Sequence, residues 1–204
     1  MLTANAQFFY VEAGKVLSSF DYKNSQGKSI GKLSGSNQNN MGLGFRMSLF
    51  RTAWHFSCGA QYNKYGAKGS DAVLGNYYEW DVTYLGGNVG VDYEFFKPPV
   101  NYNEQHGFSF FLRATSTADF LLKGSQQLNN QIFDLKGVEE FDKPIVFVKG
   151  IVGTNFYINK TFIVFAQYAY GKSFLIGSYT NQEQLRFTSH NVSIGLEINL
   201  AYSN

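Results

Sequence analysis

The sequence predicts an all-β fold, an eight-stranded antiparallel up-and-down transmembrane β-barrel with both termini in the periplasm. Apolar residues recur with a period of two along most of the chain, and short connections alternate with long ones. The composition is also unusual, with 20 Phe and 14 Tyr among 204 residues but only 16% charged residues. Soluble domains carry about a quarter charged residues, so something other than charge must suit this surface to its surroundings.

Period-two alternation sends successive side chains to opposite faces of a strand and so identifies the strands. It is cleanest over 191–200, where even-numbered residues are Val, Ile or Leu and odd-numbered ones are Asn, Ser, Gly or Glu. Segments 41–49 and 54–63 are equally regular, and weaker versions over 8–20, 78–95, 107–118, 145–157 and 161–171 bring the count to eight. Within 78–95 the apolar parity changes between Tyr84 and Val89, which predicts a β-bulge at Gly86–Gly87.

The connections between these segments decide the topology. Three are short or moderate, at 51–53, 96–106 and 158–161, and four are long and polar, at about 22–38, 64–76, 120–143 and 172–184. Alternation of long and short connections is typical of an outer-membrane barrel that keeps its termini on the side of the short turns. We therefore expect the four long loops to lie outside the cell.

Bulk properties exclude several classes of protein. A net charge of +2 from scattered basic residues does not favour nucleic-acid binding. No run of apolar residues is long enough for a transmembrane helix. Residues 1–6, with small residues at Ala4 and Ala6, resemble the end of a secretory signal, so we expect a signal-peptide remnant at 1–6 and one barrel domain over 7–204. The single Cys58 excludes an internal disulfide.

The residues of opposite parity to the aromatic ones indicate which face meets lipid. They are mostly Gly, Ser and Asn, whereas a water-exposed face would carry Lys and Glu in quantity. A narrow, filled lumen accounts for this better than a lipocalin-like barrel. We predict an ion-pair network inside the barrel, and no open pore, because buried charges are tolerated only when paired. Its members by parity are Glu12, Arg46, Asp92, Arg113, Lys149 and Glu197.

Aromatic residues of the outward parity suggest girdles at the two membrane interfaces. One group lies toward the periplasmic strand ends (Trp54, Phe95, Phe156, Phe162, Tyr202) and another toward the outer ends (Tyr62, Tyr78, Trp80, Tyr168, Tyr170). The alternative is that they are core aromatics of a soluble β-protein.

On this pattern, from Phe8 to Tyr202, the chain resembles the small eight-stranded outer-membrane β-barrel families. In its overall residue pattern it looks like the PorT-like outer-membrane barrel group of envelopes that use type IX secretion. The closing strand, His190 to Tyr202, is similar to the targeting signal read by the barrel-assembly machinery, although Ser203 and Asn204 follow it. The resemblance implies location in the outer membrane, contact with lipid and lipopolysaccharide, and protein partners in the envelope.

Catalysis has one candidate, the sequence His55-Phe56-Ser57, because outer-membrane lipid A deacylases carry a His-x-Ser pair. Its predicted parity faces the lumen, so a hydrogen-bonded lumen histidine is the favoured interpretation. His55, His106 and His190 lie on distant elements and offer no metal-ligand spacing. We expect no enzyme activity, no cofactor and no metal ion.

The longest loop, about 120–143, and a few small residues are candidates for partner contact. The loop's apolar residues (Leu128, Ile132, Phe133, Leu135, Val138) favour either a partner or packing on each other over the barrel mouth. The acidic residues at 139–142 favour solvated charge over a divalent-ion site. Ala60, Gly150 and Ala166 share the outward parity of a docking seam, but three residues do not establish one.

Three functions remain open. The leading hypothesis is a non-catalytic anchor or accessory subunit of a larger envelope complex, in secretion or outer-membrane protein biogenesis. The second is a stand-alone surface barrel that uses its outer loops for adhesion or defence. The third is a lipid A-modifying enzyme.

Overall fold

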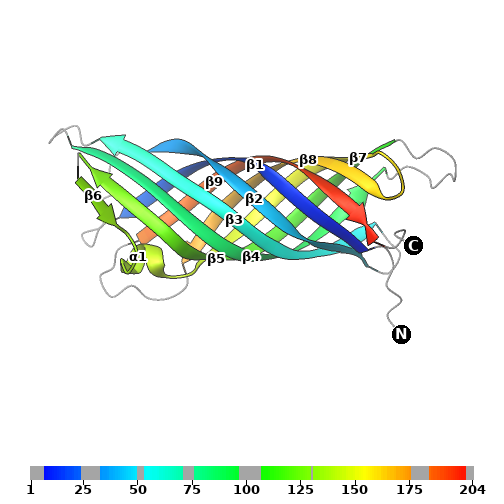
Figure 1. Ribbon diagram of the computed structural model, residues 1–204, viewed down its shortest axis with the longest axis horizontal. Helices are drawn as coiled ribbons and strands as arrows, with labels where there is room; N and C mark the ends of the chain where they lie inside the picture. Colours follow the sequence, from blue (N-terminus) through cyan, green and yellow to red (C-terminus); the bar gives the residue numbers. More distant parts are fainter. Residues whose placement is uncertain are drawn as a thin grey trace.

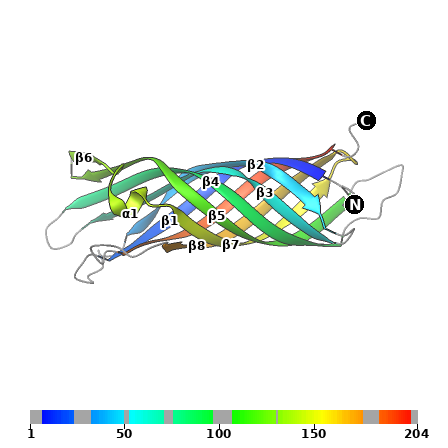
Figure 2. The same cartoon turned by 90° about the horizontal axis from the view of Figure 1, so that it is seen from below.

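The computed structural model describes residues 7–23, 33–49, 53–70, 76–96, 107–129, 131–175 and 184–200. They form a closed barrel whose neighbouring strands are all antiparallel (Figures 1 and 2). The wall consists of β1 (Gln7–Lys23), β2 (Ser34–Ser48), β3 (Trp54–Ser70), β4 (Tyr77–Phe95), β5 (Gly107–Leu128), β7 (Ile145–Tyr157), β8 (Phe162–Leu175) and β9 (Gln184–Asn199). The predicted eight-stranded antiparallel barrel is confirmed.

Two short elements lie outside this ring of strands. The four-residue β6 (Gln131–Asp134) pairs with the end of β5, and the single turn of α1 (Glu139–Asp142) leads into β7. Both lie at the end of the barrel opposite to the one where β1 begins and β9 ends (Figure 1). We call these two ends the distal end and the terminal end. No helix among the described residues is long and apolar enough to cross a membrane.

The wall strands are longer than a membrane requires. They have 13 to 22 residues, whereas a tilted strand crosses a bilayer with about 9–11. Two segments that the sequence analysis placed in long loops, 64–70 and 120–128, continue β3 and β5 as paired strand. The barrel therefore extends beyond the thickness of a membrane.

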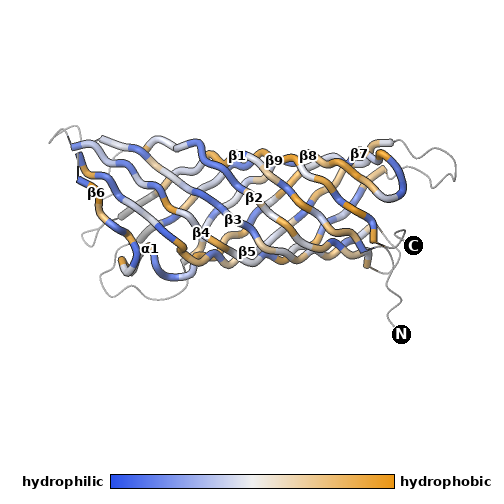
Figure 3. Tube along the Cα trace, in the orientation of Figure 1, coloured by the Kyte–Doolittle hydropathy of each residue, from blue (hydrophilic) through white to orange (hydrophobic). Residues whose placement is uncertain are grey.

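Toward the terminal end and through the middle, the outer face of the wall is apolar, and the lumen holds buried polar and charged side chains beside two small apolar clusters (Tyr10, Phe111, Ile151, Phe165, Ala169; Phe8, Tyr157, Ile163). Met41 is 60% and Ile194 66% exposed, whereas Arg46 and Glu197 are 1% exposed. Figure 3 shows hydrophobic positions concentrated there and hydrophilic ones toward the distal end. The outward apolar residues form what we call the apolar belt (Val11, Met41, Leu43, Phe45, Leu85, Val89, Val91, Phe110, Leu112, Phe120, Val148, Val152, Val164, Val192, Ile194).

At the distal end the polarity of the wall is reversed. Trp80, Val82 and Tyr84 of β4 are buried inside the barrel, while Asp81 between them is exposed. Where water surrounds the wall, apolar side chains are more stable in the lumen, as in a soluble protein. They form a cluster that we call the aromatic plug (Val16, Phe20, Tyr65, Ala67, Trp80, Val82, Tyr84, Leu135, Phe141, Ile145, Phe147, Phe187).

This reversal corrects two predictions. The change of apolar parity in β4 is not a β-bulge at Gly86–Gly87, because β4 pairs with β3 in unbroken register from Tyr77 to Tyr93. Instead, the apolar side chains move from the outer to the inner face. The register does shift between β4 and β5, where Thr83 and Tyr84 face Lys123 and Leu121, so the extra residue is in β5.

The prediction of an outward aromatic girdle near the outer strand ends is wrong for Trp80 and Tyr78. Trp80 is only 6% exposed, and Tyr78 packs against the plug and stacks on Trp80 at 5.7 Å between ring centroids. Tyr168 and Tyr170 do face outward, with 41% and 40% exposure.

The segment between β5 and β7 helps to close the distal lumen. Leu135 donates its backbone N–H to the carbonyl of Gly124 (3.0 Å), and the hydroxyl of Tyr84 donates to the carbonyl of Phe141 (3.1 Å). Leu135 is 3% exposed, and Val138 packs against the plug. The candidate partner residues therefore differ in burial: Leu135 is a core residue, and Val138 is partly buried against the plug. Ile132 and Phe133 are exposed, and Leu128 is partly buried.

Candidate functional site

The lumen near the terminal end is organised around Arg46, which is almost fully buried. Its Nη2 lies 2.5 Å from Oδ2 of Asp92 and 3.4 Å from Oε2 of Glu94, and its Nη1 lies 3.2 Å from Oε2 of Glu197. The Nε of Arg113 donates to the other oxygen of Asp92 at 3.2 Å. With His55 these residues form what we call the Arg46 cluster. One guanidinium thus joins carboxylates of two strands across the lumen, as a planar group with five donors can.

Neutral donors satisfy the remaining carboxylate oxygen of Glu94. It accepts hydrogen bonds from the hydroxyls of Ser109 and Tyr157 and, at 3.0 Å, from Nδ2 of Asn155. Because a buried carboxylate without donors is strongly destabilising, these contacts explain how the cluster tolerates so many charges away from water.

A second polar group fills the middle of the lumen. Nε2 of Gln167 donates to Glu12 at 2.6 Å, and Nζ of Lys149 donates to Gln61 at 3.4 Å. Asp119 accepts hydrogen bonds from Gln61, at 3.2 Å, and from Tyr65, also at 3.2 Å. Of the six predicted network residues, the structure joins Arg46, Asp92, Arg113 and Glu197 by ion pairs, while Glu12 and Lys149 lie apart and make hydrogen bonds.

Little open space remains between these layers. The enclosed polar space in the middle of the lumen, lined among others by Glu12, Arg113 and Lys149, has a volume of about 30 Å³. A cavity needs about 10–15 Å³ to hold one water molecule, so this space accommodates at most a few. Within the described part of the chain, the Arg46 cluster fills the lumen on one side of this space and the aromatic plug fills it on the other.

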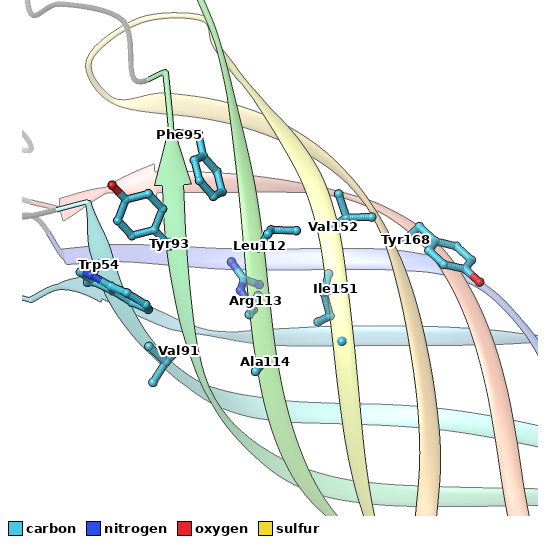
Figure 4. A pocket seen from close by; sticks show the side chains of 11 residues that line it. Trp54, Val91, Tyr93, Phe95, Leu112, Arg113, Ala114, Ile151, Val152 and Tyr168 are labelled. Atoms are coloured by element: carbon cyan, nitrogen blue, oxygen red, sulfur yellow. The ribbon is translucent and has the colours of Figure 1, made fainter.

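The outer wall carries a much larger feature, a shallow apolar hollow of about 820 Å³ (Figure 4). Two of the residues that line it, Ala114 of β5 and Gly150 of β7, face each other in register. The wall hollow, as we call it, is surrounded by larger residues (Trp54, Val91, Tyr93, Phe95, Leu112, Val152, Tyr168). A Cβ atom added at Gly150 would meet nothing within 4 Å. The hollow thus exists because two small residues lie side by side among large ones.

Comparison with solved structures shows the same fold in bacterial surface proteins. The barrel superposes on OprG, an outer membrane protein of Pseudomonas aeruginosa, with a TM-score of 0.57 and 11% identity, covering 97% of each chain. Neisserial surface protein A gives a TM-score of 0.50 and 14% identity over 94% of this chain and 97% of the other. No family model matches the sequence, and no curated protein is significantly similar to it.

The shared fold and the apolar outer face of the wall decide the class of protein. A closed antiparallel barrel with apolar side chains outside and paired charges inside is stable only with lipid around it. The protein is an outer-membrane β-barrel. Among the aromatic residues predicted for the girdles, the soluble-core interpretation fits Trp80, which belongs to the distal aromatic plug, and Tyr78, which packs against it.

The His-x-Ser pair of this outer-membrane barrel faces away from lipid. His55 and Ser57 are 0% and 1% exposed, inside the lumen. Nδ1 of His55 lies 3.2 Å from Asp92 and 3.1 Å from Nη2 of Arg46, and its Nε2 lies 3.6 Å from Glu94. The histidine is part of the Arg46 cluster and is enclosed by ionic groups, which favours the structural interpretation over a base that activates Ser57.

Sequence reasoning missed two acidic residues of the lumen. Glu94 follows Asp92 by two residues on the continuous strand β4, so this spacing was enough to place its side chain in the lumen as well. Asp119 follows the last residue assigned to its strand from the sequence, whereas β5 continues to Leu128. The polar residues Asn63 and Tyr65 that surround Asp119 had also been divided between a strand and a loop.

Proposed function

We propose that this barrel is a non-catalytic anchor or accessory subunit of a larger envelope complex, in secretion or outer-membrane protein biogenesis. In this proposal both termini are periplasmic and the distal end faces outward. The observation that carries it is the wall hollow, which is a concave apolar surface within the span of the apolar belt.

Association inside a lipid bilayer depends on close packing, because lipid tails are as apolar as the protein surface. Interfaces between membrane segments are therefore enriched in small residues that let two backbones approach. Ala114 and Gly150 supply such a site, and Trp54 and Tyr93, paired in register beside it, supply rigid aromatic edges. A transmembrane segment with a protruding side chain fits this surface better than disordered acyl chains do.

The filled lumen supports a role other than transport. Five charged residues of the Arg46 cluster are joined by ion pairs, and opening a path would separate them. The resemblance to the PorT-like group, drawn from the sequence pattern, is the reason for choosing secretion among the processes that such anchors serve.

Filling the hollow tests the proposal. Gly150→Leu places an apolar side chain where a Cβ atom meets no neighbour, so the barrel itself should fold normally. Gly87→Leu is the matched control, because Gly87 also faces outward and a Cβ atom there comes no nearer than 4.0 Å to Gly59. Each variant, tagged at the C-terminus, is extracted gently from native membranes, and co-purifying proteins are measured by quantitative mass spectrometry.

We expect wild type and Gly87→Leu to retain stoichiometric envelope partners and Gly150→Leu to lose most of them. A heat-modifiable monomer without partners in all three samples would refute the subunit hypothesis. Equal partner recovery from the two leucine variants would show that the partner binds elsewhere on the barrel.

A second candidate function, adhesion or defence at the cell surface, is favoured by β6. Ile132 and Phe133 are 74% and 45% exposed on a strand held rigidly against β5. If the protein purifies as a monomer and Ile132→Ser with Phe133→Ser abolishes binding to external targets, this function replaces the first. Unchanged lipid A in cells that carry His55→Ala is the expected result for a protein that does not modify lipid.

A further inference from the structure

We propose that a patch on the outer face of β8, β9 and β1 binds the phosphate monoester of a lipid A-type glycolipid. Lys15, Lys172 and His190 provide its positive or proton-donating groups, and Tyr168 and Tyr170 lie beside them. We call these five residues the basic patch. The inference rests on the outward orientation of the distal end that is part of the proposed function.

The strand register brings these residues together. His190 of β9 faces Tyr170 of β8 on one side and Leu17 of β1 on the other. Lys172 follows Tyr170 by two residues on the same face of β8, and Lys15 precedes Leu17 by two residues on the same face of β1. Three neighbouring strands thus each place one basic side chain on a continuous piece of outer wall.

Local contacts hold the aromatic and imidazole groups in place. The Tyr168 hydroxyl lies 2.7 Å from Nδ1 of His190, and the rings of Tyr170 and His190 are 5.1 Å apart between centroids. Nζ of Lys172 lies 6.0 Å from the centre of the Tyr170 ring. The bond to Tyr168 occupies Nδ1, so Nε2 is the imidazole nitrogen that can face a ligand.

The positive charge of the patch is not compensated by the described part of the chain. Lys15 donates to the neutral Oδ1 of Asn39 at 2.6 Å, and neither Lys15 nor Lys172 has an ion pair among the described residues. Lys68 differs, since its Nζ lies 2.7 Å from Oε1 of Glu79. Glu12 and Glu197, on the patch strands β1 and β9, point into the lumen, where they bind Gln167 and Arg46.

The surface on the terminal side of the patch suits acyl chains. Ile194 is 66% exposed there, and Val192, which faces Lys15 and Tyr168 in register, is 61% exposed at the edge of the patch. Ile194 is flanked in register by two small residues, Ala13 of β1 and Ala166 of β8, which leaves shallow tracks along its sides. A ligand that lies along this surface must be apolar on the terminal side of the patch and negatively charged at the patch itself.

The number of donors selects a phosphate monoester over a diester. A monoester carries a charge of about −1.5 to −2 at neutral pH and has three acceptor oxygens. Two ammonium groups and one imidazole match that charge, whereas a phosphodiester lipid has one charge and fewer free oxygens. Lipid A combines phosphate monoesters with several acyl chains, so it satisfies both requirements.

Native mass spectrometry of the purified, detergent-solubilised barrel tests the site. Bisphosphorylated lipid A is titrated against wild type, Lys15→Gln with Lys172→Gln, and the control Lys68→Gln, whose charge is already paired with Glu79. Enzymatically dephosphorylated lipid A and phosphatidylglycerol are titrated in parallel, and inorganic phosphate is added as a competitor. Heat-modifiable migration on gels verifies that each variant is folded.

We expect the double variant to bind lipid A about thirtyfold more weakly, since each lysine near a lipid surface contributes about 1 kcal/mol, and we expect the Lys68→Gln control to match wild type. Removing the phosphates should weaken binding to wild type as much. Equal affinity of the folded double variant and wild type would overturn the proposal. So would equal binding of phosphatidylglycerol, or full competition by inorganic phosphate at equimolar concentration. Loss of partners in Gly150→Leu is a separate readout, so the two proposals can fail independently. If labelling of intact cells shows that the distal end faces the periplasm, the patch does not face the leaflet that contains lipid A, and this proposal is overturned.

Discussion

Replacing Arg46 by Met should destabilise the barrel by about 3–5 kcal/mol, the range for breaking a buried ion pair by removal of one partner. Arg46 is 1% exposed and contacts the carboxylates of Asp92, Glu94 and Glu197 within 3.4 Å. Methionine has a similar length and is apolar, so the variant removes the charge with little change in packing. The second guanidinium of the cluster, that of Arg113, is ion-paired with Asp92 at 3.2 Å.

The free energy of unfolding is measured by urea titration of the barrel folded into phospholipid vesicles, followed by Trp fluorescence. Asp92→Asn in the Arg46→Met background is the internal test, because it removes one of the carboxylates that the first change leaves without its partner. We expect this double variant to recover part of the loss, which would show that the two residues are energetically coupled.

Lys68→Met is the matched control at an exposed ion pair, where water already screens both charges, so its expected loss is at most about 1 kcal/mol, well below that of Arg46→Met. A loss below about 1 kcal/mol for Arg46→Met would refute the reasoning. It would mean that water enters the terminal end of the lumen and solvates the carboxylates, so the cluster would not close the barrel.

Three other perturbations probe the remaining parts of the wall. Phe187→Ala should cost about 3–5 kcal/mol in the same urea titration, because the ring is 1% exposed at the centre of the aromatic plug; a loss under about 1 kcal/mol would show the plug to be loose. Gly195→Ala should prevent folding, because the added Cβ would lie 2.4 Å from a backbone carbonyl oxygen, whereas Gly150→Ala should fold like wild type. Heat-modifiable migration on gels measures folding, and equal migration of the two variants would contradict the close strand packing at Gly195. The ion pair with Lys68 lowers the pKa of Glu79, so the stabilising effect of the pair should be present at neutral pH and be lost as the pH falls through that lowered pKa. Glu79→Gln should remove this pH dependence of stability. If the variant retains it, another group is responsible.

The alternation of residue types was sufficient to predict the eight strands and the lumen face, because lipid outside and packed charges inside require opposite residue types at successive positions. Arg46, Asp92 and Glu197 could be placed in the lumen for this reason. Their pairing partners could not, since which inward residues meet depends on the stagger between strands. The register is a property of the closed ring and has no local signal in the sequence.

The distal end was less predictable because the same alternation has two meanings. Trp80 and Val82 are apolar at every second position, as lipid-facing residues are, yet they lie inside the barrel. The distinguishing signal was the charge on the other parity, Glu79 and Asp81, which no wall in contact with lipid tails would carry. The change of phase was evidence for a membrane boundary rather than for a β-bulge.

That boundary relates the features of the molecule to one another. The Arg46 cluster and the wall hollow lie within the span of the apolar belt, so the hollow meets only lipid tails or another membrane protein. The aromatic plug lies beyond the belt, where its burial is stabilised by water as in a soluble core. A barrel anchored only by its belt would need no such second core. The plug instead makes the distal wall rigid, and β6 projects from that wall with Ile132 and Phe133 exposed. Any partner that binds there meets a preformed surface and does not have to order a loop, so a given contact area yields a higher affinity.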